Sequence, residues 1–312
     1  MNVASNPINR LWDSIRGTNM RSCVKCTMFI STLILFVFLV GTVFAAEVTF
    51  TDFSYTSGLQ LNGAASTPVT GDGNVLRLVP GSSGSGSAFT TQTYNASSFS
   101  TYFSFRINGA GGVGDLSGET GGDGFAFVIQ NTSPTSLGDS GGWIGYVGVG
   151  NSIAVEFDTF NNGYGNCPYS GGIGYFNDSN TNHIGLDANG SLTTISSTEL
   201  IQSRFDDGNL WHAWIDYDGT QLGVRANQTG IRPTDALFLY AFDISSYLGG
   251  STGYLGFTGG IAAAYGNYDI PSLEYRDKYD PIAAPVPEPG TMLLLGSGLV
   301  GLVGYGRWRL KK

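Results

Sequence analysis

Two carboxylates on one short segment carry the strongest chemical signal in this chain. In the run from Ile153 to Asp158, apolar residues alternate with Ala154, Glu156 and Asp158, as they do in a β-strand. Because side chains of a strand point alternately to its two faces, Glu156 and Asp158 must lie side by side on the face opposite the apolar residues. The spacing alone therefore forces two acidic groups together.

These two carboxylates need a positive partner, because neighbouring ionised groups on a sandwich strand are costly without one. No Lys or Arg occurs between Arg106 and Arg204, so a divalent metal ion is the simplest counter-charge. Asp178 and His183 follow in the chain. Ca²⁺ prefers carboxylate, amide and carbonyl oxygens, whereas an imidazole with carboxylates suits Mn²⁺ or a similar ion, so we expect room for two ions. The alternatives are carboxylates that accept hydrogen bonds from loop amides and a structural role for His183.

The elements that position these residues are predicted to be strands. The 312 residues include 47 Gly, 16 Tyr and 19 Phe, and only 12% are charged, which is typical of an all-β protein. Alternation over 99–107 predicts a half-buried strand, and the apolar run 124–129 predicts a strand packed on both faces. The segment 210–217 runs into Asp218-Gly219, a strong hairpin signal. About 230 residues of short strands without a linker favour one sandwich domain.

Charge limits the partners of this domain. Residues 47–277 contain 6 basic and 21 acidic residues, a net charge of −15, which excludes nucleic acid and anionic lipid as good ligands. The second histidine, His212, lies between Trp211 and Trp214 on a predicted strand and is interpreted as a packing residue.

The N-terminal segment 1–46 is predicted to be a signal peptide. Basic residues precede an apolar run from Thr27 to Ala46 that closes on small residues. Met20 is an alternative translation start, and an uncleaved membrane anchor is the alternative to cleavage.

The C-terminal segment predicts sorting at a membrane. A proline-rich linker (278–290) precedes an apolar, transmembrane stretch (291–306) and a basic cytoplasmic tail (307–312). With Pro287-Glu288-Pro289 before the apolar stretch, this tail resembles the PEP-CTERM sorting signal of Gram-negative bacteria that make extracellular polysaccharide. The resemblance implies processing by an exosortase-type membrane enzyme and a place in the cell envelope or at the cell surface, anchored at least before processing. Whether the protein stays anchored or is released is left open.

The acidic segment itself resembles the metal-binding signature of legume-type lectins. The matching residues are Glu156-x-Asp158-x-Phe160-x-Asn162, then Asp178 and His183-Ile-Gly-Leu-Asp187; the glycine-rich motifs 122–127, 141–146 and 255–259 follow the family order. The resemblance implies a concanavalin A-like jelly-roll sandwich of antiparallel sheets over 47–277. It also implies that Glu156, Asp158, Asp178 and His183 hold a transition metal such as Mn²⁺, and that Asp158, the Phe160 carbonyl, Asn162 and Asp178 hold Ca²⁺.

The same resemblance implies a saccharide or exopolysaccharide as ligand. Asp123, after a non-proline cis peptide, would accept hydrogen bonds from sugar hydroxyls, and Tyr265 lies where the last specificity loop is expected. The remaining implied contacts are an amide of Gly141 or Gly142, the Asn162 side chain and the aromatic face of Phe160. Asp123 as a turn cap and Tyr265 as surface decoration are the alternatives.

The expected function is metal-dependent carbohydrate binding without catalysis. The insertion 163–177 is longer than plant lectins use; it is either a lid or a surface loop, and a loop of this length can supply other metal ligands in place of Asp178. A matrix or adhesion domain that binds no sugar is the first alternative. A jelly-roll glycoside hydrolase is the second, but the positions where it needs another acid hold Phe160 and Asn161.

Overall fold

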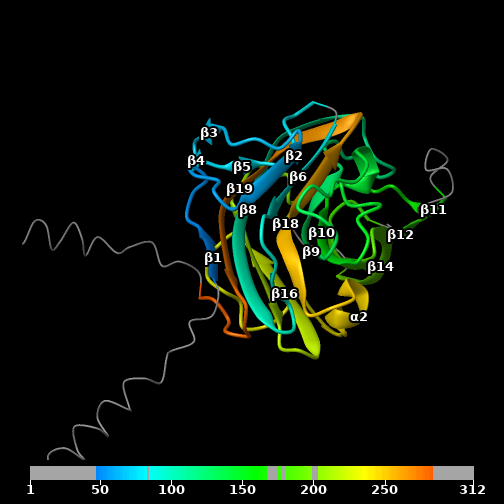
Figure 1. The fold of residues 1–312 in the computed structure, drawn as a ribbon. Helices are drawn as coiled ribbons and strands as arrows, with labels where there is room; N and C mark the ends of the chain where they lie inside the picture. Colours follow the sequence, from blue (N-terminus) through cyan, green and yellow to red (C-terminus); the bar gives the residue numbers. More distant parts are fainter. Residues whose placement is uncertain (1–46, 83, 167–174, 178–179, 199–202, 284–312) are drawn as a thin grey trace, which may run out of the picture. The chain divides into compact units, whose positions relative to one another are not determined.

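Two antiparallel β-sheets, packed face to face, account for most of the described chain (Figure 1). This computed structural model describes residues 47–82, 84–166, 175–177, 180–198 and 203–283. Contacts divide the chain into two units, Met1–Phe44 and Ala45–Lys312, and the first lies outside the described residues. The sandwich of antiparallel sheets expected from the sequence is confirmed.

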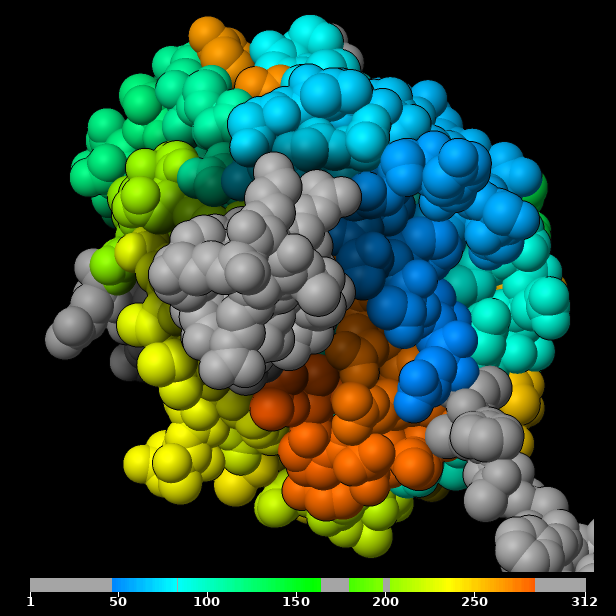
Figure 2. Space-filling view, turned by 90° about the vertical axis from the view of Figure 1, so that its left-hand side faces the viewer, coloured from blue at the N-terminus to red at the C-terminus, as the bar shows by residue number. Residues whose placement is uncertain are grey.

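The first sheet has seven strands in the order β1-β19-β8-β15-β16-β17, with the short β5 paired to β19. Their bounds are β1 Glu47–Phe50, β5 Leu76–Arg77, β8 Phe99–Gly112, β15 Trp211–Tyr217, β16 Gln221–Asn227, β17 Phe238–Ala241 and β19 Ala264–Arg276. Strands β1 and β19 are neighbours, and Figure 2 shows the blue start of the described chain beside its orange end on the surface.

The second sheet has eight strands in the order β14-β13-β10-β9-β18-β6-β2, with β7 paired to β18. Their bounds are β2 Leu59–Gly63, β6 Gly84–Thr90, β7 Tyr94–Asn95, β9 Gly124–Gln130, β10 Ser152–Asp158, β13 His183–Ala188, β14 Ser191–Thr198 and β18 Thr252–Ile261. The smaller elements are β3 Val69–Thr70, β4 Gly73–Asn74, β11 Tyr164–Asn166, β12 Tyr175–Asn177, the 3₁₀ turn η1 Gly141–Trp143 and the helix α2 Ile244–Leu248.

Aromatic side chains fill the space between the two sheets. Phe103 of β8 contacts Phe257 of β18 with ring centroids 5.0 Å apart, and Phe125 of β9 stacks on Phe157 of β10 at 4.9 Å. All of these rings are buried. The inward face of β10 therefore anchors the strand in the core and leaves its acidic face on the other side of the sheet.

The strand predictions are confirmed with one correction. The apolar run 124–129 lies in β9 and is buried on both faces, and β15 returns as β16 through the turn at Asp218-Gly219. However, the strand at 99–107 is not half-buried, because the outward residues Ser100, Tyr102 and Ser104 are also covered. The segment after β19 covers part of this face, because Asp280 contacts Ser100 and Ile282 packs on Tyr102.

The predicted features at the two ends lie outside the described residues. These are the signal peptide (1–46), the sorting motif Pro287-Glu288-Pro289, the apolar stretch (291–306) and the basic tail (307–312). Within the part of the chain that the structure describes, no helix is long and apolar enough to cross a membrane.

Candidate functional site

Three buried side chains meet on the outer face of the eight-stranded sheet. Glu156, Asp158 and His183 each offer one ligand atom, and these atoms lie within 4.8 Å of one another. All three side chains are almost completely buried, and the His183 Nε2 atom is 3.1 Å from Glu156 Oε1. Two carboxylates and one imidazole at this spacing form a donor set that suits a transition metal ion, and the residues present fit such an ion.

Strand register explains why these three side chains converge. In the antiparallel pair of β10 and β13, Asp158 lies directly opposite His183, and Glu156 lies opposite Gly185. Directly opposite residues have their Cβ atoms about 5 Å apart, and diagonal neighbours remain within reach of long side chains. His183 therefore reaches both carboxylates, one across the pair and one along the diagonal.

Glycine at position 185 is required by the Glu156 side chain. A Cβ atom on Gly185 would collide with Glu156 Oε1 and would lie 2.8 Å from Thr194 Cγ2 on β14. With hydrogen there instead, the carboxylate lies across β13 and accepts a hydrogen bond of 3.1 Å from Thr194 Oγ1. Gly185 and Thr194 thus fix the direction in which Glu156 points.

Asp187 places a third carboxyl beside the group. It lies two residues beyond Gly185 on the same face of β13 and is fully buried. Burial, and then the neighbouring charge of Glu156, raise the pKa of Asp187 well above its usual range. The sequence motif includes Asp187 but assigns it no role; in the folded protein its carboxyl lies beside that of Glu156 on the same face of the sheet.

A second group of residues lies at the end of β10, next to the carboxylates. The Gly122-Asp123 peptide bond is cis, as the lectin resemblance implied, and Asp123 is 5% exposed. A Cβ atom on Gly141 would lie 3.9 Å from Asp123 Oδ2, and one on Gly122 would lie 2.8 Å from the Phe160 ring. The structure thus brings Asp123, Gly141 and Phe160 together from three separate parts of the chain.

Hydrogen bonds connect this group to the metal-ligand candidates. The Thr159 amide donates to the Asp123 carbonyl at 3.0 Å, and the Phe160 amide donates to Asp158 Oδ1 at 2.7 Å. The loop that follows β10 is therefore tied both to the carboxylate of Asp158 and to the segment that carries Asp123.

Sequence reasoning missed one residue that supports this loop and another that is buried beside it. Arg204 forms a two-pronged ion pair with Asp206 at 2.8 Å, and its guanidinium also donates to the carbonyls of Thr159 and Thr181. Tyr268 of β19 is buried below the site; burial, and then the charges of Asp123, Asp158 and Asp206, raise its pKa well above the usual range. No local sequence pattern predicts a role for either residue, because both reach the loop after β10 from parts of the chain that are distant in sequence.

The structure describes the position of some of the other predicted site residues but not of all. Asp178 lies outside the described residues, Asn162 is half-buried in the loop after β10, and Gly142 belongs to η1. Tyr265 is 37% exposed and lies over Gly111 of β8. The roles of these residues, and of the metal and sugar contacts above, remain predictions.

The insertion after β10 contains a small hairpin. Strands β11 and β12 pair in antiparallel fashion, with Tyr164 opposite Asn177 and Asn166 opposite Tyr175. Residues 167–174, between the two strands, lie outside the described part of the chain. The lid and the surface loop both stay predictions for this insertion.

Comparisons with known proteins match both the sandwich and the tail. Residues 45–285 match the legume lectin domain family, and residues 285–309 match the PEP-CTERM protein-sorting motif. Among curated proteins, the chain is 29% identical over 190 residues to the L-type lectin-domain containing receptor kinase VIII.1 of Arabidopsis thaliana. That match covers 59% of this chain but 24% of the receptor kinase, so the chain spans about a quarter of the length of such relatives.

Solved plant lectins share the fold. Lectin II from Ulex europaeus has a TM-score of 0.58 and 23% identity, with 74% of this chain and 97% of that chain covered. Lectin I from the same plant, in complex with the methyl glycoside of α-L-fucose, has a TM-score of 0.56 and 22% identity, with coverage of 74% and 96%.

Proposed function

Because the chain belongs to the legume lectin domain family, we propose that its sandwich binds saccharides at the end of β10, in a metal-dependent way and without catalysis. The observation that carries this proposal is the convergence of two groups. The buried set of Glu156, Asp158 and His183 lies one loop away from Asp123, Gly141 and Phe160. Metal-dependent sugar binding needs metal ligands next to side chains that can bind sugar hydroxyls, and these two groups meet that need.

The metal part of the proposal rests on donor chemistry. Glu156, Asp158 and His183 would hold a transition metal such as Mn²⁺. Asp158, the Phe160 carbonyl and Asn162 would hold Ca²⁺, with Asp178 as the fourth ligand in both sets. The bound ions would supply positive charge that neutralises this acidic cluster and fixes the direction of the loop after β10.

The sugar part of the proposal rests on preorganisation. The Asp123 carboxylate accepts hydrogen bonds from sugar hydroxyls, an amide of Gly141 or Gly142 and the Asn162 side chain add polar contacts, and the Phe160 ring offers an apolar face. Since the Asp123 backbone is already tied to Thr159, a ligand loses little free energy in ordering the site. A fucose glycoside is the ligand of one lectin with the same fold, which supports neutral sugars as the ligand class.

The C-terminal sorting motif indicates where in the cell this function would be carried out. The PEP-CTERM motif at 285–309 indicates export and sorting in a Gram-negative bacterium. We propose that an exosortase-type enzyme processes the tail, and that the domain then binds polysaccharide at the cell surface or in the surrounding matrix. The net charge of −15 over residues 47–277 fits a neutral rather than an anionic polysaccharide.

Glycan-array binding of the full-length protein in detergent tests the proposal. We expect binding in Ca²⁺ plus Mn²⁺, a loss of at least tenfold after EDTA, and a similar loss in Asp123→Ala with both metals present. Asp235→Ala, which removes an exposed carboxylate elsewhere in the chain, is the matched control and should bind like the wild type. Binding that neither EDTA nor Asp123→Ala diminishes would show that this site is not the one used, and no binding at all would favour a structural or adhesive domain.

A further inference from the structure

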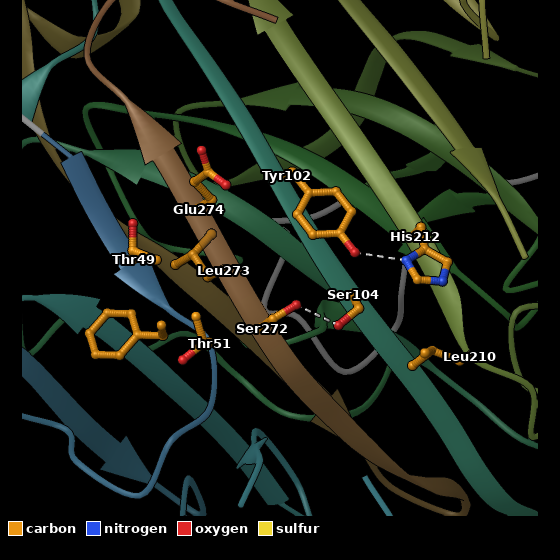
Figure 3. A pocket seen from close by; sticks show the side chains of 10 residues that line it. Thr49, Thr51, Tyr102, Ser104, Leu210, His212, Ser272, Leu273 and Glu274 are labelled. Carbon is orange, nitrogen blue, oxygen red and sulfur yellow. Dashed lines mark hydrogen bonds between the residues drawn. The ribbon is translucent and has the colours of Figure 1, made fainter. Parts of the chain in front are cut away.

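A pocket of about 290 Å³ opens on the outer face of the seven-stranded sheet (Figure 3). It is bordered by β1, β19, β8 and β15, whose inward side chains form the core. The acidic group described above lies on the outer face of the other sheet. The whole sandwich therefore separates this pocket from the proposed metal and sugar site.

Register and side-chain size create the pocket. Thr49, Glu274, Tyr102 and Trp214 are successive partners across the four strands and form one row on the outer face. In the next row, Ser272 of β19 lies opposite Ser104 of β8, and Ser104 lies opposite His212 of β15. Two small side chains in the middle of a face with larger neighbours leave a depression. The two serine hydroxyls, 2.8 Å apart, form its floor.

The larger side chains around the floor are held in place. Tyr102 and His212 stack with ring centroids 6.0 Å apart, and a hydrogen bond of 2.8 Å joins the Tyr102 hydroxyl to His212 Nδ1. Burial lowers the pKa of His212, so the imidazole is neutral near pH 7. The wall next to the serines is therefore rigid, polar and uncharged.

The lining selects a class of ligand. Hydroxyl groups of Thr49, Thr51, Ser104 and Ser272 and the carboxylate of Glu274 surround the space, whereas the Leu210 side chain and the rings of Tyr102 and His212 add apolar surface. The lining contains no Lys or Arg, and the neighbouring Arg276 is already paired with Glu274 at 2.7 Å and with Asp280 at 3.1 Å, so phosphate and carboxylate ligands lack a free counter-charge. A volume at the lower end of the range for small-molecule sites, about 300–1,000 Å³, fits one or two sugar rings.

We infer that this pocket is a second carbohydrate-binding site, for a neutral saccharide unit, that does not depend on metal. The serine and threonine hydroxyls and the Glu274 carboxylate receive the sugar hydroxyls, and Leu210 and the two stacked rings contact the ring carbons. The inference extends the proposed function: a domain with one site on each outer face links two saccharide chains, whereas a domain with one site only attaches to one.

The experiment separates the two sites by mutation rather than by metal removal. The full-length protein in detergent, loaded with Ca²⁺ and Mn²⁺, is applied to an array of neutral gluco-, galacto- and manno-oligosaccharides as wild type, Asp123→Ala, Ser272→Leu and the double variant. Ser272→Leu fills the pocket from an outward strand position. Ser246→Leu, at an exposed position of α2, is its matched control. Thermal unfolding of every variant verifies that it is folded.

The second site is supported if Asp123→Ala keeps some saccharide binding and if adding Ser272→Leu reduces that binding at least tenfold. Adding the control Ser246→Leu to Asp123→Ala should not reduce it. Ser272→Leu alone should keep the component that Asp123→Ala removes. If Asp123→Ala leaves no residual binding, or if the double variant retains it, the inference is wrong while the proposed function stands. The proposed function fails separately if Asp123→Ala removes no component of the wild-type binding.

The segment of the protein that follows β19 could occupy this pocket instead of a saccharide, and the same variants test that alternative. After β19 the chain turns back over this sheet: the Asp280 amide donates to Ser100 Oγ at 3.0 Å, and Ile282 is buried against Tyr102 and Trp214. If Ser272→Leu exposes residues after Arg276 to limited proteolysis without changing saccharide binding, the pocket serves the tail, and the inference is overturned.

Discussion

Replacing Gly185 with alanine tests whether the direction of Glu156 controls metal binding. The added Cβ atom would collide with Glu156 Oε1, and it would lie 2.9 Å from Glu156 Cδ and 2.8 Å from Thr194 Cγ2. Ordinary contact begins near 3.4 Å, so each neighbour must withdraw by half an ångström or more. Thr194 belongs to the paired strand β14 and moves little, so most of the displacement falls on the Glu156 carboxylate.

Two quantities should change. Overpacking a tight position costs about 1–3 kcal/mol of the free energy of unfolding, and each kcal/mol lowers Tm by about 2–4 °C in a domain of this size. Displacing one ligand of a metal site through its support weakens metal affinity by about 10- to 100-fold. Isothermal titration of the metal-stripped protein with Mn²⁺ measures the affinity, and calorimetric unfolding without metal measures the stability.

Two further variants sharpen the test. A Cβ atom on Gly150 meets no atom within 4 Å and its backbone is not left-handed, so Gly150→Ala should leave both quantities unchanged. Adding Glu156→Asp to Gly185→Ala shortens the colliding side chain and should restore the stability but not the Mn²⁺ affinity. Wild-type Mn²⁺ affinity in Gly185→Ala would refute the reasoning, because the carboxylate would then not need its present direction.

Two other predictions concern groups that the fold brings into place. Burial lowers the pKa of His212 below its usual 6.5, so the unfolded chain binds the proton more tightly than the folded one; the free energy of unfolding should be highest above pH 6.5 and should fall as the pH drops below it. Urea unfolding between pH 7.5 and 5.5 measures this fall, which His212→Gln should reduce. Arg204→Ala leaves the buried Asp206 carboxylate without its ion pair and frees the Thr159 carbonyl, so we expect a loss of about 3 kcal/mol in the free energy of unfolding. Saccharide binding should weaken as well, and Arg204→Lys, which keeps the charge but not the two-pronged geometry, should recover only part of each loss, as urea unfolding and glycan binding will show.

The sequence by itself determined the local pattern. Alternation in the segment that became β10 placed Glu156 and Asp158 on one face, because the two-residue period of a strand is a property of the backbone. The turn at Asp218-Gly219 was equally local. The motif resemblance then supplied the cis bond before Asp123 and the lectin sandwich, neither of which composition or spacing dictates.

The tertiary structure alone decided which distant residues meet. The register of β10 against β13 set His183 opposite Asp158 and left only a glycine opposite Glu156. Loop packing brought Arg204 to the Thr159 carbonyl, and the pairing of β8 with β19, which lie far apart in the sequence, placed two serines in the floor of one pocket. Sequence periodicity says which way a side chain points, but strand order and register, which depend on pairing over more than a hundred residues, decide what it points at.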